Sequence, residues 1–591
     1  MKKYYFILSI IISIGLLSGC NKNLDYNEIS VYDDEWVFNN EGEVSGLLGV
    51  VYAHVRFDLG DFYGGAMLAS ATDEADFTSS LSSIHRYYNG AWSSVNAFGD
   101  TWNNSYSGIY AANDFLEKLD KVFETLDIYK YNTSSSGRPY EQMRKRFELF
   151  PFQARFLRAY FHFELAKTYG NVPLITRTLT HDEANRLTRT PVQEVFQFIV
   201  DECDAIMEFL PISYAEDKPG SHIGRVNRPT ILALKARTLL YAASPLFNPE
   251  NPREAWRKAA VASKELIDYA PGWGIELSPY NSLWGPRNHY DVPEIIWFRH
   301  AGNTNQYAMY NFPVGYENTR GGNCPTQNLV DAYEYNNSAP ADLRGKTWPQ
   351  AEANGNLPAN PYQNLDPRFA WTVARSGDTW PTVEPYSVNP LETYEGGRNA
   401  APTVNATKTG YYLKKYVNGG NRVVNPEQTS YYSWIIYRLG EFYLNYAEAV
   451  FNYMGSDATA IPGGNLDMSA NDAINEMRSR LNMPLFGAET NGNAWVERYK
   501  RERMVELAFE GHRFWDVRRW KTGGDAFMKI KTINVRRVLV PGTENEYMLT
   551  YSRGPEINRG QWQEKYNLYP IPFGELRKAE SLEQNPGWEE R

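Results

Sequence analysis

The strongest constraint on the fold of this chain is a set of segments in which apolar residues recur every three or four positions. The clearest is residues 147–175, FELFPFQARFLRAYFHFELAKTYGNVPLI, where this spacing predicts one apolar stripe along a helix. Gly170 and Pro173 follow the stripe and mark the end of the helix. The stripe comprises Phe152, Phe156, Ala159, Phe163 and Ala166.

Further segments show the same periodicity, and most of them come in pairs. Within a pair, small alanines on one helix face large aromatic side chains on the other, as in tetratricopeptide-like repeats. The distance between pairs is irregular, so the sequence predicts degenerate repeats and a mainly all-α fold. The predicted helices are residues 192–210, residues 228–244 with Pro229 near the start, residues 253–270, and a further pair at 434–452 and 470–483.

Two long stretches, residues 271–333 and 336–425, have little periodicity and are rich in Gly, Pro, Asn, Tyr and Trp. Loops of this length usually carry function or are disordered, and their aromatic content argues against disorder. Tyr (42 residues) outnumbers Phe (28), and its polar edge suits a half-solvated binding surface. We therefore expect an ordered, loop-rich layer mounted on a helical scaffold.

The N-terminus has the three parts of an export signal. Lys2 and Lys3 are followed by an apolar run from Tyr4 to Leu17 and then by small residues before Cys20. This arrangement resembles the bacterial lipoprotein signal, which predicts a signal peptide over residues 1–19 and a lipidated Cys20 as the membrane anchor. The alternative is an ordinary cleaved signal with a chance cysteine. No second apolar span of 18 or more residues appears, so only the lipid would hold the chain to a membrane.

The net charge bears on possible partners, and the cysteine content bears on disulfide formation. Removal of the two signal lysines takes the formal net charge from −10 to −12, which makes nucleic acid an unfavourable partner. Besides Cys20 the chain holds only Cys203 and Cys324, and we expect them to be unpaired.

No catalytic signature is present: the sequence lacks H-E-x-x-H, G-x-S-x-G and G-x-G-x-x-G, and its 8 histidines do not cluster at metal-ligand spacing. Glu506 and Glu510 lie four residues apart in a helical segment and are candidates for an acid/base pair. Arginines within helical reach favour the other interpretation, in which both carboxylates are paired inside the scaffold.

Asp73, Glu74 and Asp76 lie together just before an aromatic segment. A calcium site is one interpretation, because hard cations take several carboxylate oxygens, and a solvated acidic turn is the favoured one.

The aromatic segment itself, residues 84–102, combines Arg86, Trp92 and Asn96. A sugar is held by its apolar face and its hydroxyls, so this mixture favours a binding surface, although core packing would explain Trp92 alone equally well.

Six blocks in order along the chain resemble the SusD/RagB family of glycan-binding outer-membrane lipoproteins. They are ARFLRAYFHFELAKTYGNVPL, ALKARTLLYAASP, YRLGEFYLNYAEA, INEMRSRLNMP, ERMVELAFEGHRFWDVRRW, and LYPIPFGEL with QNPGW. The resemblance implies four tetratricopeptide-like hairpins, an irregular region with minor β structure, and no enzymatic activity or cofactor. It also implies a single domain over residues 20–591, in which a helical part of about 20–270 precedes a loop-rich part of about 271–591.

The resemblance further implies that the protein sits on the exterior of the outer membrane. There it would cover a TonB-dependent SusC-like transporter and deliver oligosaccharides or another nutrient to it. Ligand contacts would come from the segment before the helix of Trp102, Tyr106, Ile109 and Asn113, and from loops after the strand at 294–297. In this sequence those regions supply Asp73, Arg86, Trp92, Asn96, Tyr307, Tyr310, Tyr316 and Arg320.

Two other classes of protein stay open at this point. A lipid-anchored glycoside hydrolase would share the anchor and the aromatic residues but needs two carboxylates about 5–10 Å apart across a cleft. A tetratricopeptide-type scaffold that binds only proteins would leave the long Tyr- and Trp-rich loops unexplained. The identity of the glycan is not encoded in any motif, because stacking platforms recognise ring shape only coarsely.

Overall fold

The structure is a computed structural model. The signal segment and Cys20 lie outside the residues it describes, so their assigned roles stay predictions. Among the described helices, none has both the length and the apolar character needed to cross a bilayer. The described residues are 37–589, apart from 39, 61–62, 97, 100, 129, 131–139, 215–222, 251, 285–290, 317–318, 380–389, 418–428, 488–491 and 580.

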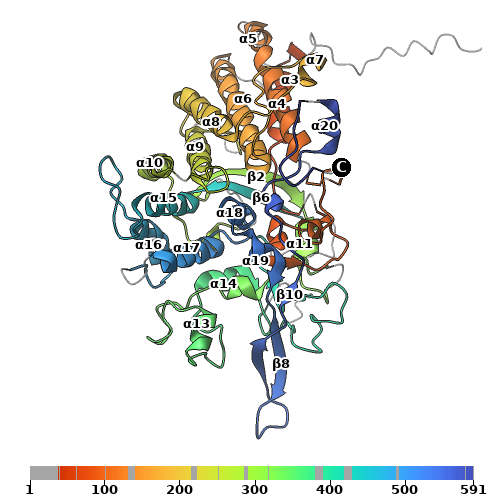
Figure 1. Ribbon diagram of the computed structural model, residues 1–591, viewed down its shortest axis with the longest axis vertical. Coiled ribbons are helices and arrows are strands. Elements are labelled where there is room, and N and C mark those ends of the chain that lie inside the picture. Colours follow the sequence, from red (N-terminus) through yellow and green to blue (C-terminus); the bar gives the residue numbers. More distant parts are fainter. Residues whose placement is uncertain are drawn as a thin grey trace, which may run out of the picture.

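A row of helices forms the upper part of the molecule (Figure 1). Each main helix contacts the next in the order α3, α4, α6, α8, α9 and α10, and α5 lies against α6. The helices predicted within residues 147–175, 192–210, 228–244 and 253–270 are therefore present. The bounds are α3 Glu41–Ala53, α4 Thr101–Glu117, α5 Leu119–Ile128, α6 Tyr140–Tyr169, α7 His181–Ala184, α8 Val192–Ile206, α9 Arg228–Ala243 and α10 Arg253–Tyr269.

Helix α6 confirms the predicted apolar stripe. Phe156, Ala159, Phe163 and Ala166 are fully buried, and Phe152 is half-buried at the margin of the core. The helix ends at Tyr169, where Gly170 takes a positive φ of 74° and its N–H donates to the Ala166 carbonyl oxygen at 2.9 Å. A glycine adopts this left-handed conformation without strain, which is why the helix stops there.

The helical row continues after the loop-rich layer. Helix α15 packs against α10, although about 170 residues separate them in sequence, and α16 packs against α15. The predicted pairs at 228–270 and 434–483 are thus neighbours in one scaffold, and the fold is mainly helical as expected. The bounds are α15 Leu439–Met454, α16 Ala470–Ser479, α17 Gly492–Glu506, α18 His512–Arg519 and α19 Gly523–Met528.

Short strands fasten the loop-rich layer to the scaffold. The antiparallel pair β2–β6 crosses the centre of the molecule, and β1 pairs with β3, which brings Asp76 opposite Cys324. The β8–β9 hairpin projects at the lower end of Figure 1. The bounds are β1 Ala75–Phe77, β2 Ile295–Thr304, β3 Asn323–Pro325, β4 Val373–Ala374, β5 Tyr412–Leu413, β6 Ser430–Arg438, β7 Lys529–Ile530, β8 Ile533–Leu539, β9 Tyr547–Arg553 and β10 Ile557–Asn558.

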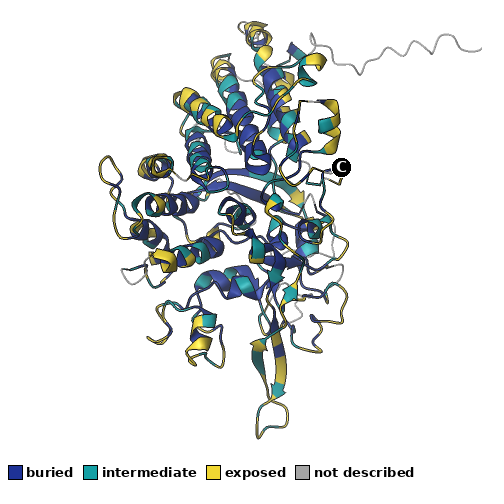
Figure 2. Ribbon diagram, in the orientation of Figure 1, coloured by how far each residue is buried: buried dark blue, intermediate teal, exposed yellow. Residues whose placement is uncertain are grey.

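Described parts of the two stretches expected to form loops contain short helices and buried aromatic side chains rather than open coil (Figure 2). One hydrophobic cluster runs from Val51 to Trp588 and joins the helical row to this layer. Cys203 and Cys324 are both buried and unpaired, as predicted. The remaining helices are α11 Gln306–Asn311, α12 Gln327–Val330, α13 Trp348–Ala353, α14 Pro367–Thr372 and α20 Phe573–Lys578.

A buried network of charges joins the helical row to the layer, and Glu506 lies at its centre. Burial alone would raise the pKa of Glu506, but the surrounding guanidinium groups hold it well below its ordinary value. Glu510 forms ion pairs with Lys415 at 3.0 Å and with Arg438 at 2.8 Å. The scaffold interpretation of both carboxylates is therefore confirmed. The three partners of Glu506 are Arg368 at 2.7 Å, Arg438 at 2.8 Å and Arg480 at 2.8 Å.

Candidate functional site

Trp92, the aromatic residue expected to stack on a ligand, is part of the core. Its indole is only 3% exposed and packs against five aromatic rings of the described chain. The prediction of an accessible platform at Trp92 is wrong, because the C-terminal segment covers the loop that carries it. The neighbouring rings are Tyr87 at 5.0 Å, Phe98 at 6.0 Å, Tyr566 at 5.7 Å, Tyr569 at 4.8 Å and Trp588 at 4.9 Å between centroids.

Tyr307 is the second candidate that the structure removes from the surface. Its side chain is also 3% exposed, and its hydroxyl lies 3.3 Å from the sulfur of Met67. Its ring packs against Tyr432 with centroids 5.4 Å apart. The burial of Tyr307 therefore contradicts the expectation that its side chain contacts a ligand.

The acidic turn of Asp73, Glu74 and Asp76 is buried, and its carboxylates accept hydrogen bonds from other parts of the chain. Asp73 is buried and receives two hydrogen bonds from Arg513, at 2.9 and 2.8 Å. Glu74 accepts from the backbone N–H of Phe509, and Asp76 accepts from Arg559 at 3.0 Å. The favoured interpretation of a solvated turn is wrong, because each carboxylate locks the turn to the C-terminal half of the chain.

The alternative of a calcium site gains no support from this geometry. All three carboxylates of the turn have donors within the protein. Within the described residues, no group of three or more His, Cys, Asp or Glu side chains is arranged to hold a metal ion.

Arg86 and Asn96 meet on the surface, as the mixture of residues in this segment suggested. An Arg86 guanidinium N–H donates to the Asn96 side-chain oxygen at 3.0 Å, and the guanidinium also lies 5.6 Å from the centre of the Phe98 ring. Asn96 is exposed and Arg86 is half-buried. Together they present amide and guanidinium donors that can reach a ligand hydroxyl.

A second accessible group forms around Tyr310. Arg320 is exposed, and its guanidinium lies 5.0 Å from the centre of the Tyr310 ring. Gly65 also packs against Tyr310: a Cβ atom at this position would fall 2.5 Å from the ring, so only glycine permits the contact. Tyr316 is half-buried, and its backbone oxygen accepts from Thr319 at 2.9 Å.

One segment of the chain connects the two groups. The Tyr63 ring packs against Phe98, and Gly65, two residues later, packs against Tyr310. The Thr78 hydroxyl also donates to the Arg320 carbonyl oxygen at 2.8 Å. We call Arg86, Asn96, Tyr310, Tyr316 and Arg320 the loop surface.

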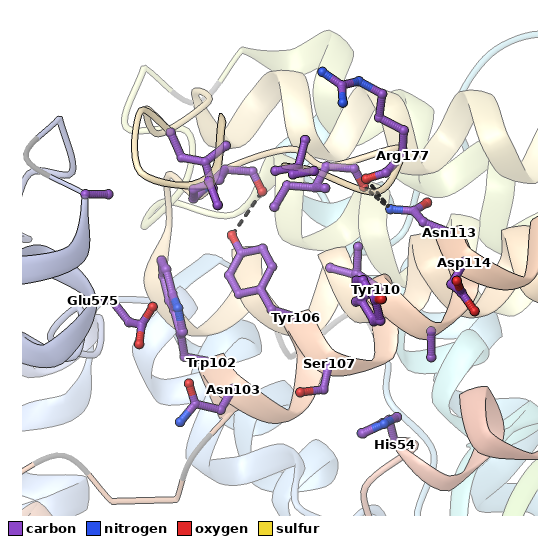
Figure 3. A pocket seen from close by; sticks show the side chains of 18 of the residues that line it. His54, Trp102, Asn103, Tyr106, Ser107, Tyr110, Asn113, Asp114, Arg177 and Glu575 are labelled. Carbon is purple, nitrogen blue, oxygen red and sulfur yellow. Dashed lines mark hydrogen bonds between the residues drawn. The ribbon is translucent and has the colours of Figure 1, made fainter. Parts of the chain in front are cut away.

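A cavity lies elsewhere, beside helix α4 (Figure 3). Its volume of about 770 Å³ is within the range of ligand sites. Trp102, Tyr106 and Asn113 line it, although they were expected only to mark the helix that follows a ligand-contact segment. A signal that could have revealed the cavity is a polar stripe at helical spacing, which consists of Asn103, Ser107, Tyr110 and Asp114.

The scaffold and its surfaces define a class of protein: a mainly helical binding protein whose accessible aromatic and polar groups lie outside its buried charge network. Comparison with known proteins gives the family. The chain matches the model of the SusD family over residues 293–588, and a model described as starch-binding associating with outer membrane over residues 51–240. The chain belongs to the SusD family.

Individual relatives agree with this assignment. SusD-like protein P38 of Formosa agariphila is 23% identical over 585 residues, which cover 92% of this chain and 96% of that protein. A SusD-like protein from Bacteroides fragilis has the same fold, with a TM-score of 0.70 at 22% identity over 94% of this chain and 98% of that one. A laminarin-binding SusD-like protein gives a TM-score of 0.60 at 21% identity, over 93% and 99% of the two chains.

Family membership also bears on two further predictions. One of the two matching models is described as starch-binding, which is a binding role and supports the prediction that the chain is not an enzyme. The description of the second model supports the predicted association with the outer membrane.

Proposed function

We propose that this protein is a lipid-anchored lipoprotein of the outer membrane that captures glycans at the cell surface and delivers them to a TonB-dependent SusC-like transporter. The observation that carries the proposal is the match of both parts of the chain to SusD family models, one of them described as starch-binding. Cys20 would carry the lipid and leave the folded chain outside the cell. No nucleic acid and no cofactor take part.

The loop surface is the proposed capture site. The Tyr310 ring is half-buried and packs closely against Gly65, so little ordering is needed when a sugar arrives. Arg86, Asn96 and Arg320 supply several N–H donors for hydroxyl groups, and neighbouring ring and amide groups hold Arg86 and Arg320 in place. Such a surface can bind an oligosaccharide along its length.

The hydrolase alternative finds little support in the same geometry. A glycosidase needs two carboxylates that face a cleft, one of them able to donate a proton. Glu506 and Glu510 are both buried and already paired with cations. A low pKa prevents Glu506 from serving as a proton donor at neutral pH.

Calorimetry on residues 21–591 tests the capture site, with maltoheptaose and laminarihexaose as probes for the two kinds of glucan suggested by the relatives. We expect Tyr310→Ala and Arg320→Ala each to weaken binding about tenfold, or about 1.4 kcal/mol. The control is Tyr269→Ala on α10, a tyrosine that is 50% exposed and lies outside the loop surface. Unchanged affinity in both loop variants would remove the loop surface from the proposal.

A further inference from the structure

The cavity beside α4 is built rather than accidental. It lies between α4, the end of α3, the segment 173–187 and α20 (Figure 3). Two hydrogen bonds tie its roof to α4: the Tyr106 hydroxyl donates to the Pro173 carbonyl oxygen at 3.0 Å, and the Asn113 amide donates to the Arg177 carbonyl oxygen at 3.0 Å. These bonds fix the position of the roof relative to the helix.

Helix α4 offers this space a polar stripe with an aromatic ring in it. Asn103, Ser107, Tyr110 and Asp114 follow each other at intervals of four, three and four residues and line the cavity. The Tyr110 side chain is 60% exposed. Within the described part of the chain, the Ser107 hydroxyl makes no hydrogen bond, so it is available to a ligand.

The charged groups around the cavity neutralise one another. Arg177 pairs with Glu183 at 2.6 Å, Lys118 pairs with Asp114 at 3.0 Å, and Lys578 pairs with Glu575 at 2.7 Å. A charged ligand would find no unpaired opposite charge in these three pairs. The complementary occupant is therefore neutral.

The polar groups and the aromatic ring on α4 distinguish between an apolar occupant and a polar, uncharged one. A purely apolar chain would remove water from the Ser107 and Tyr110 hydroxyl groups of the α4 stripe and give them no hydrogen-bond partner, which weakens its binding. A sugar ring has an apolar face for the Tyr110 ring and hydroxyls for Ser107. A neutral carbohydrate satisfies both parts of the wall.

We propose that the α4 cavity is a second carbohydrate site, separate from the loop surface, which takes a neutral sugar ring of a bound glycan. This inference rests on the proposed function and adds a place where a branch or chain end can bind. Helix α20 forms one wall, and its first residue, Phe573, is attached through its backbone N–H to the carbonyl oxygen of Ser94, in the segment between Arg86 and Asn96. The two sites therefore share a structural element.

The test uses residues 21–591 and calorimetry with maltoheptaose and laminarihexaose. In the Tyr310→Ala/Arg320→Ala background, we expect residual binding that Tyr110→Ala weakens at least fivefold. Ser107→Trp, which fills the cavity from an exposed position, should abolish that residual binding. Tyr269→Ala in the same background is the matched control and should change nothing. Thermal melts verify that each variant is folded. If Ser107→Trp does not fold, Tyr110→Ala alone decides the outcome.

The possible outcomes separate this inference from the proposed function. Residual binding that is absent, or that neither cavity variant alters, overturns the α4 site and leaves glycan capture by the loop surface intact. An intact protein that retains no polysaccharide at all overturns the proposed function and the α4 site together.

Discussion

Trp92→Ala is expected to act on stability rather than directly on ligand binding. A buried tryptophan covers about 150–250 Å², which at about 25 cal/mol/Å² corresponds to roughly 4–6 kcal/mol. Substitutions of buried Phe or Trp by Ala cost about 3–5 kcal/mol, so we expect a loss of about 4 kcal/mol. The indole N–H is buried without a hydrogen-bond partner in the described chain, so no hydrogen bond adds to this cost.

The assay is a thermal melt of the intact protein and the variant. At roughly 2.1 cal/mol/K per residue, a chain of this length has an unfolding entropy of about 1.2 kcal/mol/K, so a loss of 4 kcal/mol lowers the midpoint by about 3 °C. Trp92→Phe retains most of the packing, so its unfolding midpoint should lie between those of the intact protein and Trp92→Ala. Tyr110→Ala, which truncates an exposed side chain, is the control for stability. A Trp92→Ala protein with an unchanged melt and lost glycan binding would refute the core placement.

Three further outcomes follow from the same physical reasoning. Glu506→Gln should lower the free energy of unfolding by about 3–5 kcal/mol, because three guanidinium groups lose a buried negative charge. Denaturant unfolding measures this loss, and an unchanged midpoint would contradict the charge network. Cys20→Ala should leave a folded protein that is released from membranes, and sedimentation with outer membranes in cells lacking the transporter would contradict the lipid anchor. Burial raises the pKa of Asp58 to about 7, so its negative charge destabilises the fold increasingly as pH rises from about 4 to 7. Asp58→Asn should therefore raise the free energy of unfolding at pH 8 and change it little at pH 4. Equal changes at both pH values would contradict the raised pKa.

The helical scaffold could be predicted because its signal is local. In α6, residues three and four positions apart meet on one face, so Phe156, Ala159 and Phe163 reveal their burial through spacing alone. Gly170 marks the end of that helix for an equally local reason. The pairing of Glu506 with arginines was expected from helical spacing, but its three partners, Arg368, Arg438 and Arg480, all come from other segments.

The candidate site could be predicted only in part, because exposure in an irregular segment depends on distant residues. Trp92 is covered by Trp588, almost 500 positions later, and Asp73 is neutralised by Arg513, 440 positions later. No local pattern indicates such partners. The α4 cavity was missed for a different reason: its stripe has helical spacing, but its roof comes from the segment 173–187.

The central claim is that this protein retains glycans without cleaving them. The most direct measurement incubates the purified chain, residues 21–591, with a panel of polysaccharides that includes starch and laminarin, and assays both retention and the release of reducing ends. We expect at least one polysaccharide to be retained and no reducing ends to be released. Release of reducing ends, or retention of no polysaccharide in the panel, would contradict the claim.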